Sequence, residues 1–126
     1  MPKIHLLKFE SKTCPACQAL NRRGTVTDLV KEFPDAELTT LVIADENGES
    51  PEGSAFEEAY NLSDVLEVQA LPTIVICDER GLELGRIDQI ETITKMRKVI
   101  EGAIEYASKS QATIDQILRF KVQHPA

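Results

Sequence analysis

The chain has 126 residues, enough to bury one continuous core, so we expect a single domain over residues 1–126. Its net charge of −7 argues against a basic surface for nucleic acid, and no apolar run approaches the roughly 20 residues of a membrane span. The N-terminus leads into a strand pattern without an apolar signal segment, and the cysteine count is an odd three, which together predict a cytoplasmic protein.

The first third of the chain predicts a strand, a helix and a second strand. Residues 4–9 are apolar on both faces, as in an inner strand covered by helices on both sides. A helix is expected from about Cys14 to Phe33, with Pro15 at its first position. Gly24 lies inside this stretch and predicts a kink or a break. Residues 37–44 predict a second strand, parallel to the first.

The middle of the chain predicts a loop, a short helix and a hairpin. Residues 45–53 are acidic and rich in Gly, Pro, Asn and Ser, which indicates an exposed loop. Ser54 is expected to cap a short helix over residues 55–62. Two strands follow, over residues 74–77 and 82–87, and are expected to pair antiparallel across a turn.

The last third predicts two helices. Asp88 and Glu91 form a capping-box pattern ahead of a helix that extends to about Ala107. Residues 108–112 are polar and predict a break, after which Thr113 is expected to cap a short final helix. The apolar side chains of that helix are expected to cover the domain's own core, although dimerisation stays open; they are Ile114, Ile117 and Leu118.

This order of elements predicts an α/β fold with a central sheet and helices on both faces. The core would cover about residues 4–107, and residues 108–126 would form a C-terminal extension. The first strand should be central, because its C-terminal end would then deliver the following residues to the place where open α/β sheets present their sites.

Two cysteines follow that first strand, in the segment Cys14-Pro15-Ala16-Cys17. Two thiols at this spacing can close a small disulfide ring, and a thiol at a helix N-terminus is stabilised as the thiolate that disulfide exchange requires. Zinc binding is the main alternative, but the other ligands would have to come from Cys77, His5 and His124, which form no second close pair. We therefore expect a redox pair, no metal site and no bound cofactor, with Cys77 a small buried hydrophobe.

Two motifs together resemble the thioredoxin superfamily: the cysteine pair after a strand, and Leu71-Pro72-Thr73 ahead of the hairpin. The resemblance implies a three-layer fold with a four-stranded mixed sheet over residues 4–107. It implies that Cys14 attacks a substrate disulfide and that Cys17 resolves the mixed disulfide. It also implies a cis bond before Pro72, with the 71–73 segment binding an extended substrate.

The sequence departs from the superfamily's usual pattern at several positions. Thioredoxins carry Trp before the first cysteine and a buried acid six residues before it, whereas this chain has Thr13 and Lys8. Lys8 and Lys12 are expected to lower the thiol pKa, and the two residues between the cysteines, Pro15 and Ala16, to tune the potential. Only 13 residues precede Cys14, so the first strand and helix of full-length thioredoxins are not expected here, and the C-terminal helix is an addition.

The expected activity is thiol–disulfide exchange that reduces protein disulfides. The oxidised pair would be restored by a thioredoxin-reductase-like flavoenzyme or by glutathione, and the protein is expected to be a monomer. Two alternatives stay open. The Cys-Pro-x-Cys form is nearer to glutaredoxins, which suggests a glutaredoxin-like activity, and a protein that kept the fold without turnover would act as a binding subunit.

Overall fold

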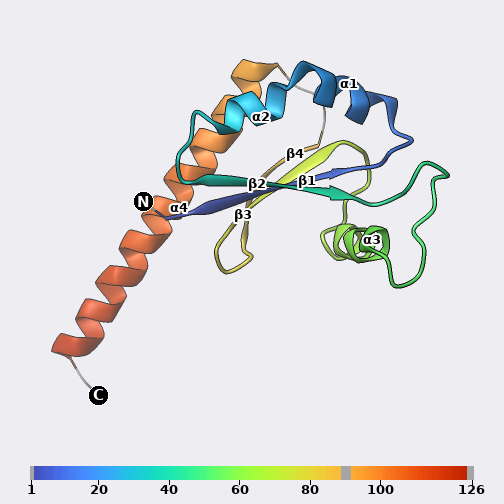
Figure 1. Cartoon of the computed structure of the whole chain (residues 1–126). Helices are drawn as coiled ribbons and strands as arrows, with labels where there is room; N and C mark the ends of the chain where they lie inside the picture. The colour runs from blue at the N-terminus through green and yellow to red at the C-terminus, as the bar shows by residue number, and fades with distance from the viewer. Residues whose placement is uncertain (1, 89–91, 125–126) are drawn as a thin grey trace.

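A four-stranded mixed sheet forms the centre of the computed structural model, which describes residues 2–88 and 92–124. The strands lie in the order β2-β1-β3-β4 (Figure 1). β1 pairs parallel with β2 and antiparallel with β3, and β3 pairs antiparallel with β4. Their bounds are β1 (Ile4–Glu10), β2 (Ala36–Val42), β3 (Thr73–Asp78) and β4 (Glu83–Ile87). The first strand is therefore an inner strand, as predicted.

Helices cover both faces of this sheet and complete three layers. One face carries α1 (Pro15–Arg23), α2 (Thr25–Val30) and the N-terminal half of α4 (Ile93–Gln123), and the other carries α3 (Ala55–Val65) (Figure 1). The predicted α/β architecture is confirmed. The ends of the elements differ from the predictions by a few residues; for example, α2 ends at Val30 and α3 extends to Val65.

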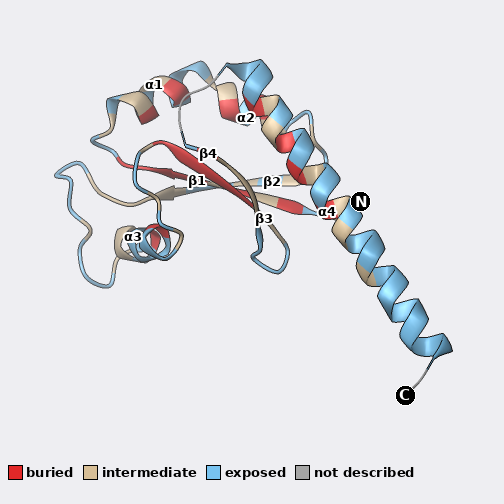
Figure 2. Cartoon of the chain, turned by 180° about the vertical axis from the view of Figure 1, so that it is seen from behind, coloured by how far each residue is buried: buried red, intermediate tan, exposed pale blue. Residues whose placement is uncertain are grey.

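The main hydrophobic core lies between the sheet and the α1, α2 and α4 face (Figure 2). Alternate side chains of a strand point to opposite faces, so Ile4 and Leu6 of β1 enter this core, where both are fully buried. Phe9, three positions beyond Leu6, lies on the opposite face and is also fully buried. The two-sided apolar pattern of the first strand thus reflects real burial on both faces.

The predicted break at Gly24 is present and separates α1 from α2. Gly24 has φ of +63°, a left-handed conformation that glycine adopts without steric cost. Its N–H donates to the carbonyl oxygen of Asn21 at 3.0 Å, which ends α1. Its own carbonyl accepts from the N–H of Asp28 at 2.9 Å, which begins α2.

The cap expected at Ser54 is confirmed, and the end of the chain differs from the prediction. Ser54 Oγ accepts from the Glu57 N–H at 3.3 Å. α4 is one helix of 31 residues, so the predicted break over residues 108–112 is wrong. Thr113 does not cap a new helix, because its hydroxyl donates to the Lys109 carbonyl one turn back, at 3.0 Å, inside a continuing helix.

The start of α4 also differs from the prediction. Thr92 is the N-cap, and its side chain accepts from the Lys95 N–H at 3.3 Å. The capping box expected from Asp88 and Glu91 falls partly on residues 89–91, outside the described residues.

The C-terminal part of α4 extends beyond the sheet and is surrounded by solvent (Figures 1 and 2). Ala107 is the last buried residue of the helix, and Ile117 and Leu118 are 50% and 55% exposed. The expectation that this segment covers the domain's own core is therefore wrong for these two residues, while Ile114 is half-buried. Within the described residues, no helix combines the length and apolar character needed to cross a membrane.

The break at Gly24 gives a direct test of the backbone at this point. We expect Gly24→Ala to destabilise the fold by roughly 1 kcal/mol, because an L-residue is strained at positive φ. The space around Gly24 is not the cause, since an added Cβ would meet Asp28 only at 3.6 Å. Gly102→Ala in α4 is the matched control and should stabilise by about 0.5–1 kcal/mol. Chemical denaturation measures both, and equal effects of the two substitutions would contradict this account.

The exposed end of α4 gives a second test. A chain that ends at Ile114 should keep the full-length free energy of unfolding within about 0.5 kcal/mol, because residues 115–124 are exposed. Urea denaturation of both chains at several protein concentrations is the measurement. A larger loss of stability would show that this segment packs against something in solution.

Candidate active site

The cysteine pair lies where β1 ends and α1 begins. After Glu10 the chain turns through residues 11–13, and Cys14 occupies the N-cap of α1. The turn is held by two backbone hydrogen bonds, from Cys14 N–H to the Ser11 carbonyl at 3.3 Å and from Lys12 N–H to the Ala44 carbonyl at 3.2 Å. Cys14 and Cys17 are joined by a disulfide, with their Cα atoms 5.3 Å apart.

The helix N-terminus gives the two sulfur atoms different surroundings. The Cys17 backbone N–H donates to Cys14 Sγ at 3.2 Å, and Pro15 takes the first helical position, where its missing N–H is not needed. Once the bond is reduced, this N–H and the helix dipole favour a thiolate on Cys14. Cys14 is partly exposed, whereas Cys17 is 1% exposed. An incoming disulfide can therefore reach Cys14 and not Cys17.

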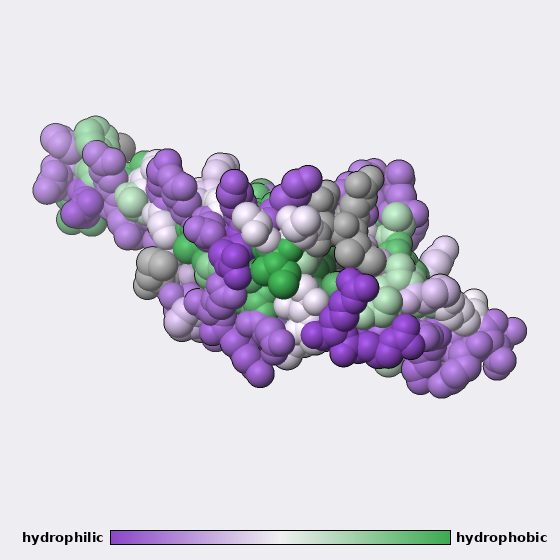
Figure 3. Space-filling model, turned by 90° about the horizontal axis from the view of Figure 1, so that it is seen from above, coloured by the Kyte–Doolittle hydropathy of each residue, from purple (hydrophilic) through white to green (hydrophobic). Residues whose placement is uncertain are grey.

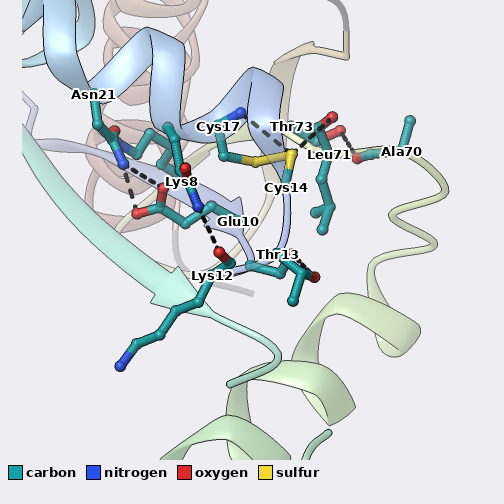
Figure 4. The surroundings of a disulfide bond; sticks show 12 residues. Lys8, Glu10, Lys12, Thr13, Cys14, Cys17, Asn21, Ala70, Leu71 and Thr73 are labelled. Carbon is teal, nitrogen blue, oxygen red and sulfur yellow. Dashed lines mark hydrogen bonds and ion pairs between the residues drawn. A yellow bond between two sulfur atoms is a disulfide. The ribbon is translucent and has the colours of Figure 1, made fainter. Parts of the chain in front are cut away.

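The Leu71-Pro72-Thr73 segment lies against this pair, although Leu71 is 57 positions from Cys14 (Figure 4). The Leu71–Pro72 bond is cis, as expected, and the Leu71 carbonyl oxygen is 3.8 Å from Cys14 Sγ. Thr73 is buried, and its hydroxyl donates to the Ala70 carbonyl at 2.6 Å. The buried Thr73 thus stabilises the loop through this hydrogen bond. Of Leu71, Pro72 and Thr73, only Leu71 is partly exposed.

A polar cluster lies beside the disulfide and joins the buried Lys8 and Glu10 to Asn21, which is an exposed residue (Figure 4). Lys8 Nζ donates to Asn21 Oδ1 at 2.5 Å, and Asn21 Nδ2 donates to Glu10 Oε2 at 2.6 Å. The sequence predicts Lys8 near the site but does not single out Glu10 or Asn21. The signals were present: Glu10 follows Lys8 by two positions on one face of a strand, and Asn21 follows Cys17 by one helical turn.

Lys12 lies close to the cysteines in sequence, but its side chain extends away from them (Figure 4). Its ammonium forms an ion pair with Glu46 at 2.9 Å and lies 5.4 Å from the centre of the Phe56 ring. The hydrogen bond from Lys12 lowers the pKa of Glu46. Lys12 therefore ties the active-site turn to the acidic 45–53 loop and to α3. Thr13 is exposed, and its hydroxyl is 3.3 Å from that of Ser11.

The three other side chains that could bind zinc lie away from the cysteine turn. Cys77 is a free thiol on β3 and pairs in register with His5 of β1, while His124 contacts the Phe120 ring at the end of α4. In residues 2–88 and 92–124, no group of three or more His, Cys, Asp or Glu side chains is arranged to hold a metal ion.

Comparison with known proteins identifies the family. The family model described as a thioredoxin-like domain matches residues 2–104, so the chain belongs to this family. No curated protein sequence matches the chain. The family match and the cysteine pair at the end of β1 support a thiol–disulfide oxidoreductase, of a class whose members act on protein disulfides.

Solved structures show the same fold at low sequence identity. Thioredoxin from Fasciola hepatica is 26% identical, with a TM-score of 0.55 over 79% of this chain and 80% of its own. Thioredoxin 1 from Thermosipho africanus is 18% identical, with a TM-score of 0.58 over 82% of this chain and 98% of its own. The oxidoreductase DsbH is 14% identical, with a TM-score of 0.62 over 79% of this chain and 74% of its own.

The third cysteine gives a test of the local electrostatics. Partial burial raises the pKa of Cys77, and the nearby carboxylates of Asp78 and Glu83 add to this effect. In a reduced Cys14→Ser, Cys17→Ser variant, we expect Cys77 to react slowly with iodoacetamide at neutral pH. The rate should rise at a higher pH than for a free model thiol, because the thiolate is the reactive form. A pH profile equal to that of the model thiol would contradict this expectation.

Proposed function

We propose that this protein reduces disulfides in protein substrates, with Cys14 as the attacking thiol and Cys17 as the resolving thiol. One observation carries the proposal: Cys14 is a partly exposed residue whose sulfur accepts a backbone N–H at a helix N-terminus, while Cys17 is buried. This asymmetry supplies one reactive sulfur and one sulfur that is protected from outside attack.

The reaction proceeds by two exchanges. The Cys14 thiolate attacks one sulfur of the substrate disulfide; that S–S bond breaks, and the leaving thiolate takes up a proton. Cys17 then loses its proton and attacks Cys14 Sγ, which releases the second substrate thiol. The substrate gains two electrons and two protons, and the protein ends with the Cys14–Cys17 disulfide that the structure contains.

The segment before Pro72 is the proposed substrate-binding surface. Leu71 is partly exposed and its carbonyl lies 3.8 Å from Cys14 Sγ, so an extended substrate segment that pairs with this backbone would place its disulfide at the reactive sulfur. The buried Pro72 and Thr73 hold the segment in position.

Reduction is the proposed direction, and the cytoplasm is the proposed location. Cys77 is a free thiol in the same chain as the redox pair, which fits a compartment in which glutathione and thioredoxin systems keep thiols reduced. A flavoprotein reductase or glutathione would return the pair to the dithiol form after each turnover, and no bound cofactor takes part.

The direct test is reduction of insulin disulfides in the presence of dithiothreitol. Cys14→Ser should lower the rate to that of dithiothreitol alone, because the attacking sulfur is lost. Cys77→Ser is the matched control and should keep the wild-type rate. When reduced Cys17→Ser is incubated with insulin after removal of dithiothreitol, a mixed disulfide between Cys14 and the substrate should accumulate, visible by non-reducing electrophoresis.

The insulin assay, run beside one with a glutathione mixed disulfide as substrate, separates the alternatives. Full activity of Cys14→Ser would overturn the proposal. A wild-type protein that forms its disulfide but shows no turnover would indicate a binding subunit. Activity only towards glutathione mixed disulfides would indicate the glutaredoxin-like alternative.

A further inference from the structure

β2 forms one edge of the sheet, and among residues 2–88 and 92–124 no strand pairs with its outer side (Figure 1). The backbone just before and just after β2 pairs with β1. The Asp35 carbonyl accepts from β1 at 3.0 Å, and the Ile43 N–H donates to β1 at 2.8 Å. Because alternate residues of a strand direct their backbone groups to opposite sides, the even-numbered residues point away from β1. These outward residues are Leu38, Thr40 and Val42.

The outward backbone groups have no partner in the part of the chain that the structure describes. None of the three residues forms a backbone hydrogen bond outside the sheet. An unpaired strand edge is a template for another extended segment, and proteins usually protect such edges with proline, charge, a bulge or short length. β2 is seven residues long, has no proline, no lysine and no register shift, and carries one charged residue, Glu37. This edge is therefore open to a further strand.

The opposite edge of the sheet is protected in the usual ways. The pairing of β4 with β3 contains a register shift between Ile76 and Cys77. β4 is only five residues long, and it carries the charged side chains of Glu83 and Arg86, which form an ion pair at 2.7 Å. Of the two edges, β2 is thus the one that the fold leaves unprotected.

The two faces beside the β2 edge differ in chemistry. On the face of the main core, Leu38 packs against the core but is only partly buried, whereas the helices that cover this face present a mostly hydrophilic surface (Figure 3). On the face of α3, the side chain of Glu37 is 56% exposed. Lys3 Nζ and His5 Nδ1 each lie 3.8 Å from Glu37 Oε2, too far for a hydrogen bond. An added strand would therefore meet apolar surface on one face and a carboxylate on the other.

The segment that carries this edge is acidic throughout. Every charged residue between Lys31 and Arg80 is Asp or Glu, and this stretch includes β2, the 45–53 loop and α3. A second copy of the chain would bring two such edges together, with like charges opposed. A basic segment would be attracted instead, with Lys or Arg side chains beside Glu37 and apolar side chains beside Leu38. Charge complementarity thus selects a basic partner over a second copy.

We propose that the outer edge of β2 docks an extended, basic segment of a partner protein, which adds to the sheet as a further strand. Its residues alternate between basic side chains on the α3 face and apolar or β-branched side chains on the core face. Main-chain hydrogen bonds to Leu38, Thr40 and Val42 hold the segment, and the alternation of its side chains gives specificity. This inference goes beyond the proposed function and does not depend on the cysteines.

The probe is a capped peptide of alternating Lys and Val, equal in length to the seven residues of β2 and free of cysteine. Amide hydrogen exchange of the oxidised protein, followed by NMR, reports on the edge directly. The amides of Leu38, Thr40 and Val42 should exchange fast in the free protein and about tenfold more slowly with the peptide in excess. The amides of Thr39 and Leu41, which face β1, should change little.

Three variants separate the backbone from the charge. Thr40→Pro removes an outward N–H and leaves the ladder to β1 intact, so it should fold and weaken peptide binding about tenfold in titration calorimetry. Glu37→Lys should weaken binding about threefold or more, because it reverses the charge beside the docked segment. Asp115→Lys makes the same change of charge on the exposed end of α4, away from the sheet, and should alter binding less than about twofold.

Slower exchange at the three outward amides, together with weaker binding by Thr40→Pro, would support the docking site. Absence of binding at about 1 mM peptide would overturn it, as would equal binding of a matched Glu–Val peptide or unchanged binding by Thr40→Pro. Protection of the same amides at high protein concentration without peptide would place a second copy at the edge and overturn the basic partner.

Should Thr40→Pro not fold, the amide exchange and Glu37→Lys still decide the question. The peptide has no disulfide, so a failure to bind leaves the reduction of insulin untouched. The docking site and the proposed function can therefore fail independently.

Discussion

The register between β1 and β3 is the constraint on which the site depends. Phe9 of β1 lies opposite Thr73 of β3 in an antiparallel ladder. This pairing fixes where both strands meet the loops beyond them, because the cysteine turn follows the end of β1 and the Pro72 loop precedes the start of β3. Cys14 Sγ and the Leu71 carbonyl come within 3.8 Å for this reason, although neither motif indicates the other. A slip of the register by one residue would turn every β1 side chain to the opposite face.

One face of β1 also combines packing and polarity along its length. Ile4 and Leu6 enter the main core, and the same face continues at its C-terminal end as Lys8 and Glu10. Buried charges are costly unless they are paired and hydrogen-bonded, and here Asn21 of α1 completes the pairing. One strand thus carries the apolar core at one end and a neutral polar cluster beside the redox pair at the other.

Much of this protein follows from local sequence patterns. The order of the elements, the break at Gly24 and the helix cap at Ser54 are set by periodicity, glycine conformation and short-range hydrogen bonds, which residues within a few positions decide. The end of α4 was predicted less well. Polar residues 108–112 predicted a break, but they continue the helix, because serine, lysine and glutamine are tolerated on an exposed helix and the Thr113 hydroxyl bonds back to Lys109.

The sequence by itself determined that two thiols lie between a strand and a helix, and that a strand hairpin follows a proline motif. Local chemistry is sufficient for those conclusions. Only the tertiary structure decided that Cys14 is accessible and Cys17 is not, that Lys12 extends towards Glu46, and that Lys8 is paired with Glu10 through Asn21. These properties arise from contacts between segments that are distant in the chain or lie on different elements. The direction and burial of a side chain depend on which element packs against it, and composition and spacing do not contain that information.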